Sequence, residues 1–342
     1  MQTSSGFYKG DRLTQSPTMA SPTLAEVIAM AQAGQSLVRD PTHADKESFR
    51  AAFATGGKGW ATFKNVLSPV IRDVLRKAYY DTFDKVCPNW RTKGFNGSHA
   101  CSIVKPYGIP TGTWESWIVR LAYIQWLKAL TGDGRDYACS MDALAFSLLS
   151  HETKKSTTTP HTDMSTGSPS FKLEQRRQEM GEPFPCLQAQ VNIEQHPNGT
   201  ELRFGRTIPL NELTSNNKQD YTKVEEPVTQ KAQVESGDVV MWRSNTVHAT
   251  RKSGIRFKPG AGIGRIGQFA CAYPKVYRSE KAKRDKIKRF LQGMATGHLP
   301  TVCVKDGGRN HMSNHPARKD TYCTPLPCPT NPSLVAFAKT LV

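Results

Sequence analysis

The residues of this sequence best suited to chemistry are His161 and Asp163, which are separated by one residue, and His248 farther along the chain. On an extended segment, residues i and i+2 point to the same side, so His161 and Asp163 can act together. Two imidazoles and one carboxylate form the facial ligand set of non-haem ferrous iron, which leaves the opposite positions of the metal open. The pattern predicts an iron centre with His161, Asp163 and His248 as metal ligands and catalytic residues.

A second His-x-Asp sequence, at His43 and Asp45, has a different interpretation. It opens a segment, residues 46–53, that has the pattern of a helix, so Thr42 or Asp45 is expected to cap that helix. His161 instead follows an apolar run and a polar turn. We therefore expect the pair at His43 to play no part in binding metal.

An arginine completes the predicted site. Residues 264–273 have the pattern of a final strand, and Arg265 stands at its start. A guanidinium that points inward from such a strand can bind a carboxylate with its planar fork. At an iron site of this kind, the carboxylate would be the far end of 2-oxoglutarate. Arg256 and Arg251 are closer to His248 in sequence and remain alternatives for this role.

These motifs resemble the Fe(II)/2-oxoglutarate-dependent dioxygenase superfamily, and within it the TET/JBP branch, which oxidises 5-methylpyrimidines in DNA. The resemblance covers roughly residues 140–290 and rests on four segments: 160–163, 236–242, His248 and 264–270. It implies Fe(II), 2-oxoglutarate and O2 as cofactor and co-substrates. It also implies that oxidative decarboxylation of 2-oxoglutarate to succinate drives hydroxylation of an unactivated C–H bond.

Within that branch, the resemblance implies a methylated pyrimidine, 5-methylcytosine or thymine in DNA, as the substrate. The sequence departs from the branch pattern at Thr166, Cys271 and Tyr273. Tyr273 stands where some members have a base-contacting His, and its ring can stack on a base or hydrogen-bond with it. Two other functions stay open: a phytanoyl-type oxygenase of a small molecule or an amino-acid residue, and a non-catalytic barrel that binds without turnover.

The charge of the chain favours a polyanionic partner, with nucleic acid, here DNA, first. The 342 residues include 46 Lys and Arg against 29 Asp and Glu, a net charge of +17. Residues 275–289 concentrate this charge in an expected exposed helix. Three of its side chains share one face and are predicted to contact phosphates: Lys281, Arg284 and Lys288. A second basic patch follows the iron motif and is predicted to flank the mouth of the site: Lys172, Arg176 and Arg177.

Composition excludes several classes of protein. The mean hydropathy is −0.52, and no run of about 18 apolar residues predicts a transmembrane helix. The first ten residues lack the apolar core of a signal peptide. The eight cysteines are scattered, which favours reduced thiols in a cell interior. We therefore expect an intracellular protein, nuclear if the source is eukaryotic, with no membrane partner.

The predicted fold is α+β: a double-stranded β-helix, or jelly-roll, barrel with N-terminal helices packed against it. The expected parts are a helical region (1–139), the oxygenase core (140–275), and a basic helix with a loop-rich tail (276–342). Helices are predicted at 22–33, 61–75 and 114–127, with a loop at 88–113.

Strands are predicted at 143–149, 187–194, 200–204 and 264–273, and the turn at 196–199 is expected to join the middle two as a hairpin. The tail holds five residues that could bind zinc: Cys303, His311, His315, Cys323 and Cys328. They lack a Cys-x-x-Cys spacing, so an ordinary loop-rich tail is the expectation.

Overall fold

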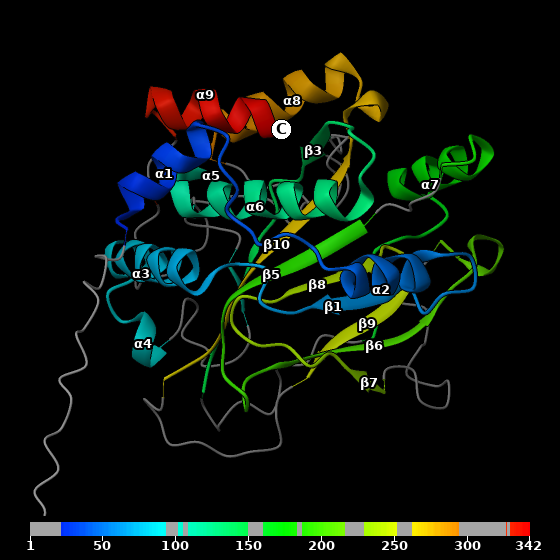
Figure 1. Ribbon diagram of the computed structural model, residues 1–342, viewed down its shortest axis with the longest axis horizontal. Coiled ribbons are helices and arrows are strands. Elements are labelled where there is room, and N and C mark those ends of the chain that lie inside the picture. Colours follow the sequence, from blue (N-terminus) through cyan, green and yellow to red (C-terminus); the bar gives the residue numbers. More distant parts are fainter. Residues whose placement is uncertain are drawn as a thin grey trace, which may run out of the picture.

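The computed structural model describes residues 22–93, 102–104, 109–149, 160–182, 187–215, 229–251, 262–293, 326 and 329–342. These residues form two antiparallel sheets and a layer of helices (Figure 1). The larger sheet runs in the order β1 (Trp60–Phe63), β8 (Val239–Arg243), β5 (Leu187–Gln195), β10 (Ile263–Pro274), β4 (Leu144–Leu148) and β2 (Ser102–Val104), and β3 (Tyr137–Cys139) also pairs with β10. The smaller sheet runs in the order β7 (Gln230–Lys231), β6 (Glu201–Thr207) and β9 (Thr246–Arg251).

Helices cover the face of the larger sheet that points away from the smaller sheet (Figure 1). The described helices are α1 (Leu24–Gln32), α2 (His43–Phe53), α3 (Pro69–Val86), α4 (Trp90–Lys93), α5 (Ile109–Gly112), α6 (Trp114–Thr131), α7 (Pro169–Glu179), α8 (Glu280–Leu291) and α9 (Pro332–Leu341), with short 3-10 turns η1 (Leu210–Glu212) and η2 (Lys275–Tyr277). One buried apolar cluster joins α1, α6, β10 and α9, so the three parts expected from the sequence share a core.

Helix α6 is the centre of the helical layer. It is apolar on most of its surface, as expected for a helix buried on several sides, and it ends at Gly132 in the left-handed conformation (φ 62°). Trp117 of α6 meets Phe290 of α8 with ring centroids 5.4 Å apart. The buried Arg120 donates hydrogen bonds to the main-chain carbonyls of Ser140 and Asp142, which ties α6 to the strands below it.

The two faces of the larger sheet differ in what they touch. On β8, Val239 and Met241 join the core under the helices, whereas Val240 and Trp242 face the smaller sheet. From the smaller sheet, Phe204 packs against Trp242, with ring centroids 5.8 Å apart. The two sheets are therefore stacked layers, and alternate residues of each central strand point into the space between them.

Two predictions about local structure are wrong. Residues 60–63 are not helical but form strand β1, which pairs with β8, and the helix begins at Pro69 with Ser68 as its N-cap. Ladder hydrogen bonds to β8 outweigh the local helical pattern here. The predicted hairpin also fails, because β5 pairs with β8 and β10 whereas β6 pairs with β7 and β9. The turn after β5 crosses from one sheet to the other.

Other predictions agree with the structure. The helices at 22–33 and 114–127 and the strands at 143–149 and 264–273 are confirmed, and so is a mixed fold of helices and antiparallel sheets. The loop expected at 88–113 differs from the structure, because its described portions contain α4, β2 and α5. No helix in the described part of the chain is long and apolar enough to cross a membrane.

The described cysteines are free thiols. Cys87, Cys139 and Cys271 are all buried, and burial raises the pKa of Cys139 to about 11. The Cys139 thiol therefore stays protonated at neutral pH. The cysteines and histidines considered for a zinc site in the tail lie outside the described residues.

Candidate metal centre

The structure brings His161, Asp163 and His248 together at the edge of the smaller sheet. His248 lies on β9, and the chain at His161 forms a short antiparallel bridge with it. The two main chains exchange hydrogen bonds: His161 N donates to His248 O at 3.1 Å, and His248 N donates to His161 O at 2.9 Å. This pairing fixes the two imidazoles on neighbouring extended segments.

The three side chains have the spacing of ligands around one ion. His161 Nε2 lies 3.6 Å from Asp163 Oδ1, and His248 Nε2 lies 3.2 Å from Asp163 Oδ2. One ligand atom from each residue falls within 4.8 Å of the other two. Two ligand atoms about 2.1 Å from one ion and at right angles to each other would be about 3 Å apart. The cluster therefore fits a facial set of two nitrogens and one oxygen.

Main-chain contacts fix the orientation of these ligands. His248 Nδ1 lies 3.0 Å from the carbonyl oxygen of Thr246 and can donate to it, which leaves Nε2 as the metal ligand. Asp163 N donates to the carbonyl oxygen of Ser244 at 3.0 Å. The turn between β8 and β9 thus supports two of the three ligands through its carbonyl groups.

The centre is partly shielded from water and still accessible. The side chains of His161, Asp163 and His248 are 23%, 13% and 9% exposed, respectively. The Trp242 ring lies 5.5 Å from the His248 ring, and that of Phe204 lies 6.3 Å away. These aromatic rings come from both sheets and limit the access of water from the interior side.

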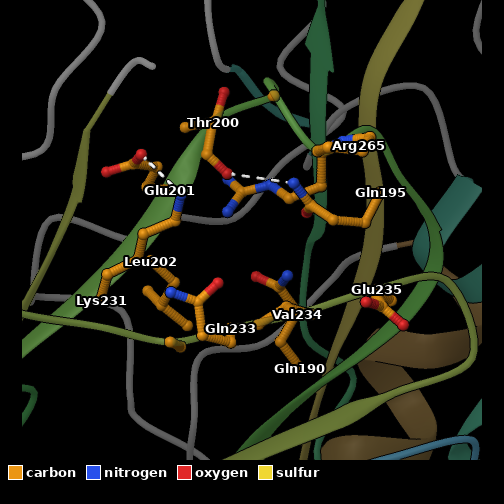
Figure 2. Close-up of a pocket in the computed structure, with 13 residues that line it drawn as sticks. Gln190, Gln195, Thr200, Glu201, Leu202, Lys231, Gln233, Val234, Glu235 and Arg265 are labelled. Carbon is orange, nitrogen blue, oxygen red and sulfur yellow. Dashed lines mark hydrogen bonds and ion pairs between the residues drawn. The ribbon is translucent and has the colours of Figure 1, made fainter. Parts of the chain in front are cut away.

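Arg265 lies near the start of β10 with only 2% of its surface exposed. It lines a cavity of about 140 Å³ between the sheets, to which Gln190 also contributes from the larger sheet and Leu202 and Lys231 from the smaller one (Figure 2). A buried guanidinium in such a cavity is suited to binding a carboxylate.

The cavity and the metal centre occupy the same space between the sheets. On β6, Phe204 is the partner of His248, and Leu202, two residues away, lines the cavity with Arg265. Two residues of a strand span about 7 Å. The cavity of Arg265 therefore begins two residues along β6 from the strand partner of His248.

Three further buried polar residues were not singled out from the sequence, and one of them, Gln190, lines the cavity of Arg265. The Oε1 atoms of Gln188 and Gln190 and the Oγ atom of Ser147 are buried without a hydrogen-bond partner among the described residues. Gln188 and Gln190 occupy alternate positions of β5. Both faces of β5 are buried, so the amides form a polar lining inside the fold. In the sequence, the sign that these residues lie inside the fold was that uncharged amides, and not charged side chains, alternate with the apolar residues of this strand.

The remaining predicted site residues are not at the metal ligands. Tyr273 is buried against Tyr277, with ring centroids 5.1 Å apart. The main chain of Arg251 lies in β9, and Arg256 lies outside the described residues. Helix α8 presents three exposed basic side chains on the helical layer, to which Phe290 fixes it: Lys281, Arg284 and Lys288.

Of the second basic patch, Lys172 and Arg176 are exposed on α7. Arg177 is buried, pairs with Glu174 at 2.6 Å and also donates to the carbonyl of Glu182. The charge of Arg177 is therefore paired within the fold.

No protein-family model and no curated protein sequence matches the chain. Solved structures similar to it include the hypothetical protein JW0805 from Escherichia coli (13% identity, 81% of this chain and 82% of that chain covered, TM-score 0.45). EctD from S. alaskensis, solved with 2-oxoglutarate and 5-hydroxyectoine, is 14% identical over 78% of this chain and 87% of its own, with a TM-score of 0.42. The α-ketoglutarate-dependent carbocyclase SnoK from nogalamycin biosynthesis is 14% identical over 68% and 84%, also with a TM-score of 0.42.

Proposed function

We propose that this protein is an Fe(II)- and 2-oxoglutarate-dependent dioxygenase. One observation carries the proposal: the cluster of His161, Asp163 and His248 shares the space between the sheets with the buried guanidinium of Arg265. Imidazole and carboxylate ligands suit ferrous iron, and the guanidinium suits the distal carboxylate of 2-oxoglutarate.

The order of the strands supports the same proposal. Successive segments of the chain alternate between the two sheets. Strands β4, β5, β8 and β10 belong to the larger sheet. The bridge at His161 follows β4, strands β6 and β7 follow β5, and strand β9 follows β8, and all of these belong to the smaller sheet. We infer that these segments form a double-stranded β-helix, the fold expected from the sequence.

Bound iron with 2-oxoglutarate and O2 would supply an oxidant strong enough to attack an unactivated C–H bond. The residues of the chain provide the geometry. His161, Asp163 and His248 would hold the metal on one face, and Arg265 with Gln190 would orient the co-substrate from the other end of the cavity. Trp242 and Phe204 would keep bulk water from the interior side of the centre.

For the substrate, a methylated pyrimidine in DNA remains our first candidate. It is supported by the resemblance of the motifs and by the net charge of +17. A base would have to be flipped out of the duplex to reach the metal, or be presented in a single strand. The burial of Tyr273, the predicted base contact, favours the alternative of a small molecule or an amino-acid residue.

The test begins with an anaerobic titration of the purified protein with Fe(II) and 2-oxoglutarate. DNA and air are then added, and mass spectrometry measures 2-oxoglutarate, succinate and the nucleosides of the DNA. The proposal expects a charge-transfer absorption band that needs both additions, and succinate after air enters. Succinate without oxidised nucleosides would favour a small-molecule substrate. An absorption band without succinate formation would favour a non-catalytic barrel that binds its ligands without turnover. Absence of the band would contradict the proposal.

A further inference from the structure

We propose that a basic groove beside the metal centre binds a phosphate group of the substrate. This inference rests on the proposed oxygenase function and names the chemistry by which the substrate is held. The groove is lined by residues 55–58, by the end of β6, by η1 and by the turn between β8 and β9. Its volume of about 1170 Å³ is far larger than that of the cavity at Arg265, so it can take a sizeable ligand.

The groove and the metal centre share one structural element, the turn between β8 and β9. Arg243 and Asn245 of this turn line the groove. Ser244, between them, accepts the hydrogen bond from Asp163 N, and Thr246, the next residue, accepts from His248. A ligand held against this turn therefore lies next to the residues that orient two metal ligands.

The glycine-rich segment 55–59 is fixed to the same turn. Gly59 O accepts hydrogen bonds from Arg243 N at 2.9 Å and from Thr246 Oγ1 at 3.0 Å. Gly59 has a φ of 78°, and a Cβ atom there would lie 1.9 Å from Thr207 Oγ1, so only glycine fits. This close approach places the neighbouring Lys58 at the groove in a defined position.

The charges that line the groove are mainly positive. Lys58 is exposed and its ammonium lies 4.1 Å from the centre of the Trp60 ring, an interaction that leaves its charge in place. The Arg243 guanidinium donates to the carbonyls of Phe53 and Ala54, neutral groups that also leave its charge in place.

Two more arginines line the groove, and both have acidic partners. Arg206 is 62% exposed and pairs with Glu212, and Arg177 pairs with Glu174. The acidic residue that lines the groove, Glu182, is held by Arg135. The charges of Lys58 and Arg243, together with that of Arg206, whose partner Glu212 is not among the residues that line the groove, therefore give the groove a positive potential. A concave surface of one sign concentrates an oppositely charged ligand, and Lys and Arg are the side chains that bind phosphate.

The phosphate could belong to a nucleic-acid strand or to a free phosphorylated molecule. The probe is the full chain without metal, titrated with a fluorescent single-stranded oligonucleotide from low to moderate salt and then competed with a nucleoside monophosphate. An oligonucleotide that binds far more tightly than the mononucleotide identifies a strand as the source. Similar affinities per phosphate identify a free phosphorylated molecule.

The variant that tests the groove is Lys58→Gln with Arg206→Gln. Its matched control is Lys77→Gln with Lys339→Gln, which also removes two exposed charges, one of them paired with a carboxylate (Lys77 with Asp81). We expect the groove variant to bind about tenfold more weakly and to lower the salt slope by up to about two units, roughly one for each phosphate that is no longer neutralised. The control should stay within about twofold of the parent.

Equal weakening in both variants, an unchanged groove variant, or a parent that binds neither probe would overturn the groove proposal. Lys58→Gln alone, at an exposed position, repeats the test if the double variant loses its fold. The absorption band of the Fe(II) and 2-oxoglutarate titration is measured separately. Loss of the absorption band with intact oligonucleotide binding would contradict only the oxygenase proposal. An intact band without oligonucleotide binding would contradict only the groove proposal.

Discussion

The main chains of His161 and His248 hydrogen-bond to each other in both directions, at 3.1 and 2.9 Å, although the two residues are far apart in sequence. Their imidazole rings consequently lie with centroids 4.5 Å apart, and Asp163 reaches both of them. The cluster that we propose as a metal site is therefore positioned by main-chain pairing between two segments.

Substitution of a ligand should abolish metal binding and turnover with little effect on folding. We expect His161→Ala and Asp163→Ala to lose the Fe(II)-dependent formation of succinate, because two ligands cannot hold the ion on one face. Both side chains lie at the partly exposed edge of the smaller sheet, so the thermal midpoint should change little. Wild-type consumption of 2-oxoglutarate by His161→Ala would show that the ligands are assigned incorrectly.

The second His-x-Asp sequence should affect stability and leave catalysis unchanged. The His43 side chain is 81% exposed, whereas Asp45 accepts hydrogen bonds from Thr42 and Arg39 at the start of α2. Partial burial alone would raise the pKa of Asp45, but the hydrogen bonds from Arg39 and Thr42 outweigh it and hold that pKa below its usual value. Asp45 should therefore stabilise the fold above pH about 4, and this contribution should disappear as the pH falls further.

Denaturant unfolding across pH checks this expectation. Asp45→Asn should lower the free energy of unfolding by about 1 kcal/mol at neutral pH, the usual cost of losing a helix cap, and converge with the parent in acid. His43→Ala should match the parent in stability and in succinate formation. A drop in turnover of His43→Ala would implicate the first motif in the chemistry.

Arg265→Ala should raise the concentration of 2-oxoglutarate that the protein requires. Loss of one partner of a buried charge pair costs about 2 kcal/mol or more, which corresponds to roughly a 30-fold weaker affinity. The anaerobic titration measures this affinity directly. Arg256→Ala is the comparison: a strong effect there with a near-neutral Arg265→Ala would move the anchor to Arg256, and no effect in either would indicate a different co-substrate.

Gln190→Leu should weaken 2-oxoglutarate binding and leave Fe(II) binding unchanged. The Gln190 side chain lines the cavity of Arg265, and its Nε2 amide carries a second N–H besides the one that donates to Asn192 Oδ1, so it can donate to a carboxylate. Leucine has a similar size and removes the polar atoms, so we expect the affinity to fall about 3- to 10-fold, the net worth of one hydrogen bond. Equal weakening of metal binding would place Gln190 in the support of the fold instead.

The basic face of α8 is predicted to contact phosphates, and salt dependence tests this. Replacement of Lys281, Arg284 and Lys288 by Gln should weaken binding of DNA across sequences and lower the salt slope by about one unit for each of these side chains that binds a phosphate. The matched control removes three other exposed charges: Arg50, Lys77 and Lys339. A slope that equals that of the control would show that α8 serves solubility or another role.

Several features followed from the sequence alone because their causes are local. The helix at α2 is set by Thr42 and Asp45, which form a capping box within three residues. The alternation of 264–273 predicted β10, and the side-chain period of a strand put His161 and Asp163 on one side. The types and spacing of these residues predicted the cluster of His161, Asp163 and His248 that the structure shows.

Other features depended on pairing between distant segments. The register of β1 with β8 made residues 60–63 a strand, although the local pattern favoured a helix. The pairing of β5 and β6 with different sheets replaced the expected hairpin and enclosed Gln188 and Gln190. The basic groove likewise combines segments far apart in sequence, among them residues 55–58 and the turn before His248, which Gly59 joins through a hydrogen bond. Residue types and local spacing thus determined which side chains can bind a metal or a carboxylate. Long-range strand pairing decided which of these side chains lie close together in the fold, because each pairing depends on a partner segment that is distant in the sequence.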